Sequence, residues 1–154
     1  MIVVDVNVLV AMHRRDHPGH LTADAALRPR LARRGAGVLV PGVCWAGLAR
    51  IATNHRVFPS PSTPQDVQTI AHQIMAAPGY QEFADPPGLN RRFFGLCVQA
   101  DATGNLVADA YIAAIAQGFA CPVLTFDTDF YKFDRLEVEL LKPASASPRP
   151  TGGN

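Results

Sequence analysis

Four aspartates stand at positions where a folded chain could bring their carboxylates together. Asp5 ends the run IVV in MIVVDVNVLV, a stretch typical of a short, fully buried strand. Asp109 lies within the apolar helical segment LVADAYIAAIA, and Asp127 and Asp129 follow the apolar run VLTF. A buried, unpaired carboxylate needs a compensating partner, a bound cation or a proton. These residues are therefore the candidates for the chemistry of the protein.

Carboxylates that converge in one cleft repel one another, and a bound divalent cation removes that repulsion. Oxygen ligands without a His or Cys partner favour Mg²⁺, or Mn²⁺ in its place, over Zn²⁺. Each aspartate taken alone could instead be a helix cap or a turn residue. Asp109 fits that alternative least, because it lies too deep in its helix to cap it and has apolar neighbours.

The hydrophobic pattern predicts strands that alternate with helices. Expected strands cover residues 2–4, 38–41, 122–126 and 138–141, with a weak one at 80–84. Expected helices cover residues 7–15, 21–34, 42–54, 64–77, 85–100 and 106–118, with a short helical turn at 128–133. This order indicates an α/β fold, with a central, mostly parallel sheet flanked by helices on both faces. Ligands bind beyond the carboxyl ends of such strands. Asp5 falls at that place after the first strand, and Asp127 and Asp129 fall there after a later one.

Local signals predict where some of these elements begin and end. Asn7 is suited to cap the first helix, and Pro29 should end or kink the second. Thr63 or Ser62 should cap the helix that begins at Pro64, since proline is tolerated in the first turn of a helix.

The composition is typical of one globular domain, which we place at residues 1–142. Of the 154 residues, 48% are hydrophobic and 18% are charged. No segment approaches the ~20 apolar residues of a membrane span, and the N-terminus lacks the features of a signal peptide. The small, polar segment 143–154 should be disordered. Three cysteines without a CxxC pair indicate reduced thiols, so the expected location is the cytoplasm, with secretion left open.

Basic residues gather in arginine clusters, although the formal net charge is only +1. The clusters lie at 14–15, 28–34 and 91–92, and each could be a solvated helix face or a phosphate contact. His13, His17 and His20 have a spacing that suggests zinc. Because Pro18 and Gly19 interrupt any helix that could align them, loop histidines are the better interpretation.

Three segments resemble the acidic motifs of the PIN-domain ribonucleases, and most of all those of the VapC toxins. They are MIVVDVNVLV, NLVADAYIAAIA and VLTFDTDF, which occur in the family's order and at its chain distances. The segment WAGLARIATN followed by RVF is similar to a VapC subgroup. The resemblance covers about residues 1–142 and implies a PIN-like three-layer fold.

The resemblance also implies a function. The protein would be a magnesium-dependent endoribonuclease, the toxin of a type II toxin–antitoxin pair, cleaving tRNA or rRNA to restrain translation and growth. A cognate VapB-type antitoxin would silence it, and the family usually forms homodimers. Asp5 and Asp109 would be the principal metal ligands, Asp127 would complete the metal site, and Asp129 would join the catalytic cluster.

Further roles follow by position from the same resemblance. Asn7 would orient a ligand or water beside Asp5, and Thr125 could form a hydrogen bond within the cluster. Arg50, a charged residue on an apolar helix, would pair with a site carboxylate or bind an RNA phosphate. The remaining candidates for contacts with RNA phosphates are Arg14, Arg15, Arg91 and Arg92.

One position departs from the family pattern. Many members carry a Glu in a motif like E-L-x-R, whereas Gly47 stands at that place here. A site that lacks one carboxylate should bind metal more weakly, and a second metal ion above all. A non-cleaving PIN-like module that binds RNA or antitoxin is therefore the alternative function.

Two other interpretations have less support. The opening strand-D-x-N motif is also similar to the nucleophile loop of haloacid-dehalogenase-like phosphatases. That chemistry needs a second Asp where Asn7 stands and a Lys before the last acidic motif, but no lysine precedes Lys132. Trp45, Phe93 and Phe94 could stack on bases, but their helical spacing favours core or dimer contacts.

Overall fold

The computed structural model describes residues 1–143, so the predicted disordered segment lies, from residue 144 on, outside the described residues. The strands are β1 (Ile2–Val4), β2 (Val38–Leu39), β3 (Val123–Thr125) and β4 (Val138–Leu140). The helices are α1 (Val6–His13), α2 (His20–Ala32), α3 (Gly42–Ala52), α4 (Pro64–Met75), α5 (Leu89–Gln99) and α6 (Asn105–Gly118), with a 3₁₀ turn η1 (Thr128–Lys132).

The four strands form one parallel sheet in the order β2-β1-β3-β4. In the register, Val3 is opposite Leu39 on one side and Val123 on the other. These apolar, β-branched residues are buried, as expected for a parallel sheet covered on both faces. The predicted parallel α/β sheet is confirmed.

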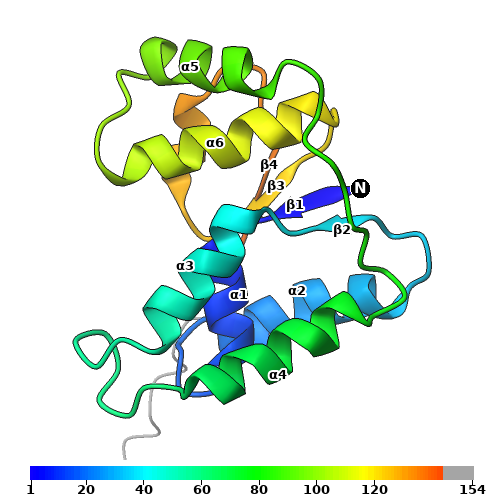
Figure 1. Ribbon diagram of the computed structural model, residues 1–154, viewed down its shortest axis with the longest axis vertical. Helices are drawn as coiled ribbons and strands as arrows, with labels where there is room; N and C mark the ends of the chain where they lie inside the picture. Colours follow the sequence, from blue (N-terminus) through cyan, green and yellow to red (C-terminus); the bar gives the residue numbers. More distant parts are fainter. Residues whose placement is uncertain (144–154) are drawn as a thin grey trace, which may run out of the picture.

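Helices cover the sheet on two sides, which confirms the predicted three-layer arrangement. Figure 1 shows α5 and α6 together on one side of the sheet and α1 to α4 grouped on the other. Helix α6 carries Ala110, Ala113, Ala114 and Ala116, all fully buried. Their small side chains allow the helix axis to approach the sheet closely, and this places the first turns of α6 near the end of β1.

The first helix begins differently from the prediction. Asp5, rather than Asn7, is the N-cap of α1, and its carboxylate accepts a hydrogen bond from the Val6 backbone N–H at 2.6 Å. Both residues have suitable side chains, but the strand ends one residue before Asp5, so the chain turns into the helix there. Asn7 lies inside the first turn, and its side chain is free for other contacts.

Of the two effects predicted for Pro29, ending the helix is wrong: α2 continues to Ala32, because Leu27 and Leu31 on either side of Pro29 are buried in the core. The weak strand predicted at 80–84 is also wrong. The segment 80–84 forms a single bridge between Tyr80 and Val38 and no strand.

The prediction for the fourth helix holds. Thr63 caps α4 in a capping box with Asp66, and Pro64 is its first residue. Among residues 1–143, no helix has the length and apolar character needed to cross a membrane.

Candidate active site

Asp5 is a buried carboxylate at the carboxyl end of β1, with 2% of its surface exposed. One of its oxygens accepts the bond from the Val6 N–H, and the other accepts from Thr125 Oγ1 at 2.7 Å. Burial raises the pKa of Asp5 to about 6, although both hydrogen bonds act in the opposite direction. A negative charge on Asp5 is therefore costly unless a cation or a proton compensates it.

A short hydrogen-bond network joins the ends of β1 and β3. Thr125 Oγ1 donates to Asp5 and accepts from Asn7 Nδ2 at 3.1 Å and from the Asp127 N–H at 2.9 Å. Asn7 Oδ1 accepts in turn from the Phe126 N–H at 3.2 Å. The predicted hydrogen bond of Thr125 within the cluster is confirmed, and the network fixes the orientation of the Asp5 carboxylate.

Asp109 lies half-buried in the second turn of α6. Burial raises its pKa to about 7, and the charges of Asp5, Asp127 and Asp129 add to the shift. The four aspartates are thus close enough to repel one another, which is what their sequence positions predict. Among the described residues, the Asp109 carboxylate has no hydrogen-bond or ion-pair partner.

The two aspartates after β3 are held by local contacts. Asp127 is the N-cap of η1, and its carboxylate accepts from the Asp129 N–H at 2.8 Å. Asp129 forms an ion pair with Lys132, with 2.9 Å between Oδ1 and Nζ. The positive charge of Lys132 also acts to lower the pKa of Asp109, so Lys132 lies near the acidic cluster.

The donor set is carboxylate oxygen, which suits a hard divalent cation such as Mg²⁺. Each oxygen of Asp5 accepts one hydrogen bond and retains a lone pair, and the Asp109 carboxylate is free. Within residues 1–143, however, no three His, Cys, Asp or Glu side chains stand close enough to hold a metal ion. The residues fit the cation by chemistry and charge, while the carboxylates are not gathered into a ligand shell.

Sequence reasoning missed two neighbours of the cluster. Cys44 on α3 is buried, and burial raises the pKa of its thiol well above the ordinary value, with the charges of Asp5 and Asp109 adding to the effect. A cysteine on an apolar helix face gives no signal of this placement. The other neighbour is Val6, which packs against Gly47: a Cβ on Gly47 would lie 2.8 Å from Val6 Cγ2. Val6 therefore occupies the space beside the position of the family Glu.

The structure gives Arg14 a role that differs from its predicted phosphate contact. Its guanidinium forms a two-pronged ion pair with Asp16, at 2.6 and 2.9 Å, and lies 4.2 Å from the ring centre of Phe58. It also donates to Ser62 at 3.2 Å. These contacts occupy Arg14 within the chain, whereas its neighbour Arg15 is exposed, and a contact of either residue with an RNA phosphate stays a prediction.

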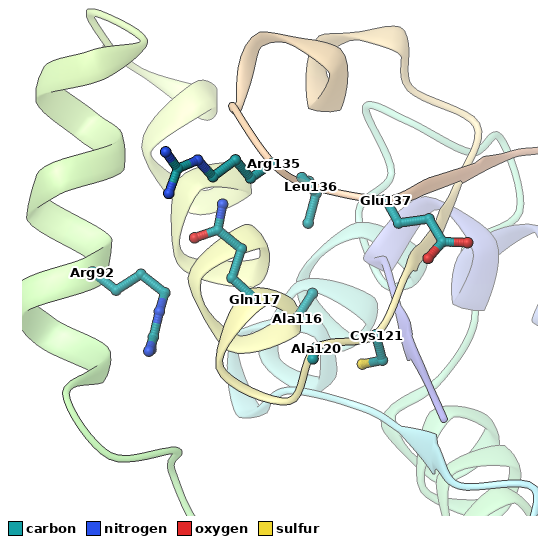
Figure 2. Close-up of a pocket in the computed structure, with 8 residues that line it drawn as sticks. All are labelled: Arg92, Ala116, Gln117, Ala120, Cys121, Arg135, Leu136 and Glu137. Carbon is teal, nitrogen blue, oxygen red and sulfur yellow. The ribbon is translucent and has the colours of Figure 1, made fainter.

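Arg92 also lies away from the acidic cluster. It lines a pocket of about 410 Å³, shown in Figure 2, with Gln117, Arg135 and Glu137. A Cβ on Gly118, at the end of α6, would lie 3.1 Å from Arg92 Nη1. Gly118 follows Asp109 by nine residues, roughly 13 Å along the helix axis. Arg92 therefore places a cation near the negative end of the α6 dipole, on the far side from the site.

The other candidates are exposed or bound elsewhere. Arg50 and Arg91 are exposed, and neither forms an ion pair with a described residue. Phe94 is 64% exposed and so is not part of the core, whereas Phe93 packs on Tyr111. The three histidines have separate partners: His13 bonds to Ser62, His17 to the Gly19 N–H and His20 to the Ala11 carbonyl.

Comparison with known proteins assigns the family. The family model described as PIN domain matches residues 2–136. Ribonuclease VapC31 of Mycobacterium tuberculosis is 38% identical over 136 residues, which cover 86% of this chain and 93% of that protein. Ribonuclease VapC43 of the same species is 37% identical over 136 residues, which cover 88% and 92%.

Two solved structures share the fold. One is VapBC2 from Rickettsia felis bound to a DNA fragment from their promoter, with a TM-score of 0.67, 13% identity and coverage of 92% of this chain and 100% of that chain. The other is FitAcB from Neisseria gonorrhoeae, with a TM-score of 0.60, 19% identity and coverage of 90% and 96%. From its acidic motifs, its fold and these relatives together, the chain belongs to the PIN-domain family and, within it, to the VapC ribonucleases of toxin–antitoxin systems.

Proposed function

We propose that the protein is a magnesium-dependent endoribonuclease, in which Mn²⁺ can replace Mg²⁺. The observation that carries this proposal is the gathering of four aspartates at one edge of the sheet, where Thr125 joins Asp5 after β1 to Asp127 after β3 and where the charges of Asp5, Asp127 and Asp129 all act on Asp109. Buried groups with strongly shifted pKa values mark functional sites. A bound divalent cation would attract each of these carboxylates and so offset the repulsion among them.

Asp5, Asp109 and Asp127 would hold the cation, and their carboxylates would have to move closer together than they stand in the structure to do so. Bound there, it would supply the positive charge that stabilises the phosphate in the transition state and lowers the pKa of the attacking water. Thr125 and the Val6 N–H would keep Asp5 oriented, and Asn7 would hold Thr125 in place. Asp129 would orient the attacking water, with Lys132 limiting its negative charge.

The partners in this proposal follow from the family. The substrate is cellular RNA, either tRNA or rRNA, and cleavage restrains translation and growth. The exposed Arg15, Arg50 and Arg91 are the residues proposed to contact its phosphates. A VapB-type antitoxin would inhibit the enzyme, as the VapBC2 pair of Rickettsia felis suggests, and the active form would be a homodimer. A neighbouring reading frame for a small DNA-binding protein would identify that antitoxin.

The test is cleavage of total cellular RNA, with the cut sites mapped, in Mg²⁺ and in EDTA. Asp5→Asn and Asp109→Asn should each lower the rate at least ~100-fold, because the loss of a residue that only orients a metal ligand already costs about 10–100-fold. Asp24→Asn is the matched control, since Asp24 pairs with Arg28 on α2. Wild-type rates in both site variants, with unchanged circular dichroism, would refute the proposal.

A non-cleaving binding module is the second candidate. Gly47 removes a carboxylate that many relatives have, and Val6 fills the space beside it. Such a module would bind RNA or antitoxin but leave RNA intact in saturating Mg²⁺ and Mn²⁺. Membership of the PIN family leaves the phosphatase interpretation without support.

A further inference from the structure

The pocket that Arg92 lines, of about 410 Å³, lies at the edge of the sheet opposite the acidic cluster. Its wall includes Cys121, just before β3, and Leu136 and Glu137, just before β4. Because the sheet is parallel, these residues lie at the amino ends of the strands, whereas the acidic cluster lies at their carboxyl ends. The pocket is therefore separate from the candidate active site.

Two arginines give one end of the pocket a positive charge. Arg92 comes from α5, and Arg135 comes from the segment between η1 and β4. Figure 2 shows the Arg135 side chain extending toward α5, while the Glu137 carboxylate points away from both guanidinium groups. Within residues 1–143, neither arginine forms an ion pair. Both positive charges are therefore available to a ligand.

Arg92 also has a hydrogen-bond donor without an acceptor. Its Nη1 atom is buried and, among the described residues that are not exposed, it is the only buried side-chain nitrogen or oxygen with no hydrogen-bond partner. Leaving a buried donor unsatisfied is costly, so such a group in a folded chain calls for a partner. The nearby negative end of the α6 dipole is equivalent to only about half a charge and makes no hydrogen bond to this atom. An oxygen of a bound anion would supply the missing acceptor.

The segment that carries Arg135 is held against both helices on this side of the sheet. Gln117 Nε2, on α6, donates to the Asp134 carbonyl at 2.7 Å, and the Asp134 N–H donates to Gln99 Oε1, on α5, at 3.2 Å. These bonds fix the backbone next to Arg135 before any ligand arrives. Binding therefore has to order only side chains, which lowers its entropic cost.

The arginines favour a phosphate monoester among the common anions. Guanidinium groups donate pairs of hydrogen bonds to phosphate oxygens. A phosphate monoester carries a charge of about −1.5 to −2 at pH 7, which matches two arginines, whereas a carboxylate carries only a single charge. The pocket volume of about 410 Å³ lies within the range of roughly 300–1,000 Å³ that is usual for sites of small ligands.

We propose that this pocket binds a phosphate monoester, with Arg92 and Arg135 donating to its oxygens. Its ligand is either a free small molecule, such as a nucleoside monophosphate, or the 5′-phosphate at the end of an RNA. The Glu137 carboxylate, at the other end of the pocket, can accept a hydrogen bond from a hydroxyl or N–H group of the same ligand. This binding site goes beyond the proposed ribonuclease function and does not depend on it.

Binding of adenosine 5′-monophosphate to the wild-type chain in EDTA, measured by isothermal titration calorimetry, tests the proposal in the absence of metal. The monophosphate should bind roughly 10- to 100-fold more tightly than adenosine, because hydrogen bonds to a charged group are the strong ones. Inorganic phosphate should compete with it. A short RNA with a 5′-phosphate, compared with the same RNA ending in a 5′-hydroxyl, distinguishes the sources: tighter binding than the free monophosphate identifies an RNA end, and weaker binding identifies a small molecule.

Two substitutions assign the binding to the pocket. Arg92→Gln and Arg135→Gln should each weaken binding of the monophosphate roughly 10- to 100-fold. Arg34→Gln is the matched control, because Arg34 is exposed and lies outside the pocket, and it should leave the Kd unchanged. Arg135 is itself exposed, so Arg135→Gln keeps the test decisive if Arg92→Gln fails to fold. Absence of binding at millimolar monophosphate, or the same Kd in wild type and Arg135→Gln, would overturn the proposal.

Discussion

Aspartates in two regions of the molecule have opposite electrostatic surroundings. On the helices that cover one side of the sheet, Asp24 pairs with Arg28 and Asp66 with Thr63, and these contacts lower the pKa of both carboxyls. At the carboxyl edge of the sheet, burial and mutual repulsion raise the pKa of Asp5 and Asp109. In the first region Asp24 has an ion-pair partner and Asp66 a hydrogen-bond partner, whereas the second region has an excess of negative charge.

This difference separates residues that support the fold from residues that are available for chemistry. The contacts of Asp24 and Asp66 favour the folded state, and both carboxylates already have partners within the chain. The unmatched ones oppose folding when charged, and they can lower their free energy only by taking up protons or a cation. A cation should therefore gain more free energy by binding at the acidic cluster than by binding near Asp24 or Asp66.

The largest expected effect is on stability in the presence of metal. Mg²⁺ at one hundred times its Kd should raise the free energy of unfolding by about 2.7 kcal/mol, a rise in Tm of roughly 5–10 °C. Asp109→Asn should abolish most of this rise, because it removes the free carboxylate. Thermal unfolding with and without Mg²⁺ measures it, and an equal rise in the variant would contradict the assigned ligand.

A smaller effect is expected from pH in EDTA. With a folded-state pKa of about 7 and an ordinary value of 3.8, Asp109 keeps its proton in the folded chain while the unfolded chain loses it. Stability should fall as pH rises from about 4 to 7. After allowance for solvent screening, the loss due to Asp109 is about 1–2 kcal/mol. Denaturant unfolding of Asp109→Asn should show a shallower fall, whereas an unchanged slope would contradict the raised pKa.

A substitution at a helix cap on the side of the sheet that carries Asp24 and Asp66 should have the effect usual for helix caps. Thr63→Ala removes the N-cap of α4 and should destabilise the protein by about 1 kcal/mol. Thr69→Ala, on the exposed face of the same helix, is the control and should cost less. Urea unfolding of both variants measures the difference. Equal losses would show that the cap has no stabilising role of its own.

The smallest effect is expected for the exposed pair of Asp24 and Arg28. Asp24→Asn should lower Tm by less than about 2 °C at low salt, because an exposed pair on a helix contributes little. In 0.5 M NaCl the difference from wild type should disappear. A loss that persists in high salt would mean that Asp24 acts through something other than its charge.

The sequence predicts the gathering of the acids because parallel strands bring their carboxyl ends to one edge. Asp5 and Asp127 end or follow neighbouring strands, and the Ala-rich face of α6 brings Asp109 close to β1. The sequence does not predict which polar residue caps α1, since Asp5 and Asn7 both have suitable side chains. That choice depends on where the strand ends, which the sheet register decides.

Contacts between distant segments were not predictable in the same way. Arg14 packs on Phe58, which comes from the loop before α4, and nothing in the local pattern indicates this pairing. The position of Cys44 beside the acidic cluster was not predictable either, because a cysteine among apolar residues has the ordinary pattern of a core position. The tail predicted to be disordered lies, from residue 144 on, outside the described residues.

The packing of Val6 against Gly47 constrains how the site can evolve. The methyl group of Val6 would lie 2.8 Å from any Cβ at position 47, and a β-branched side chain has few alternative rotamers with which to withdraw. A glutamate introduced at position 47 would therefore need Val6 to shift or to be replaced by a smaller residue. Adding this carboxylate to the cluster is thus a matter of two neighbouring positions rather than one.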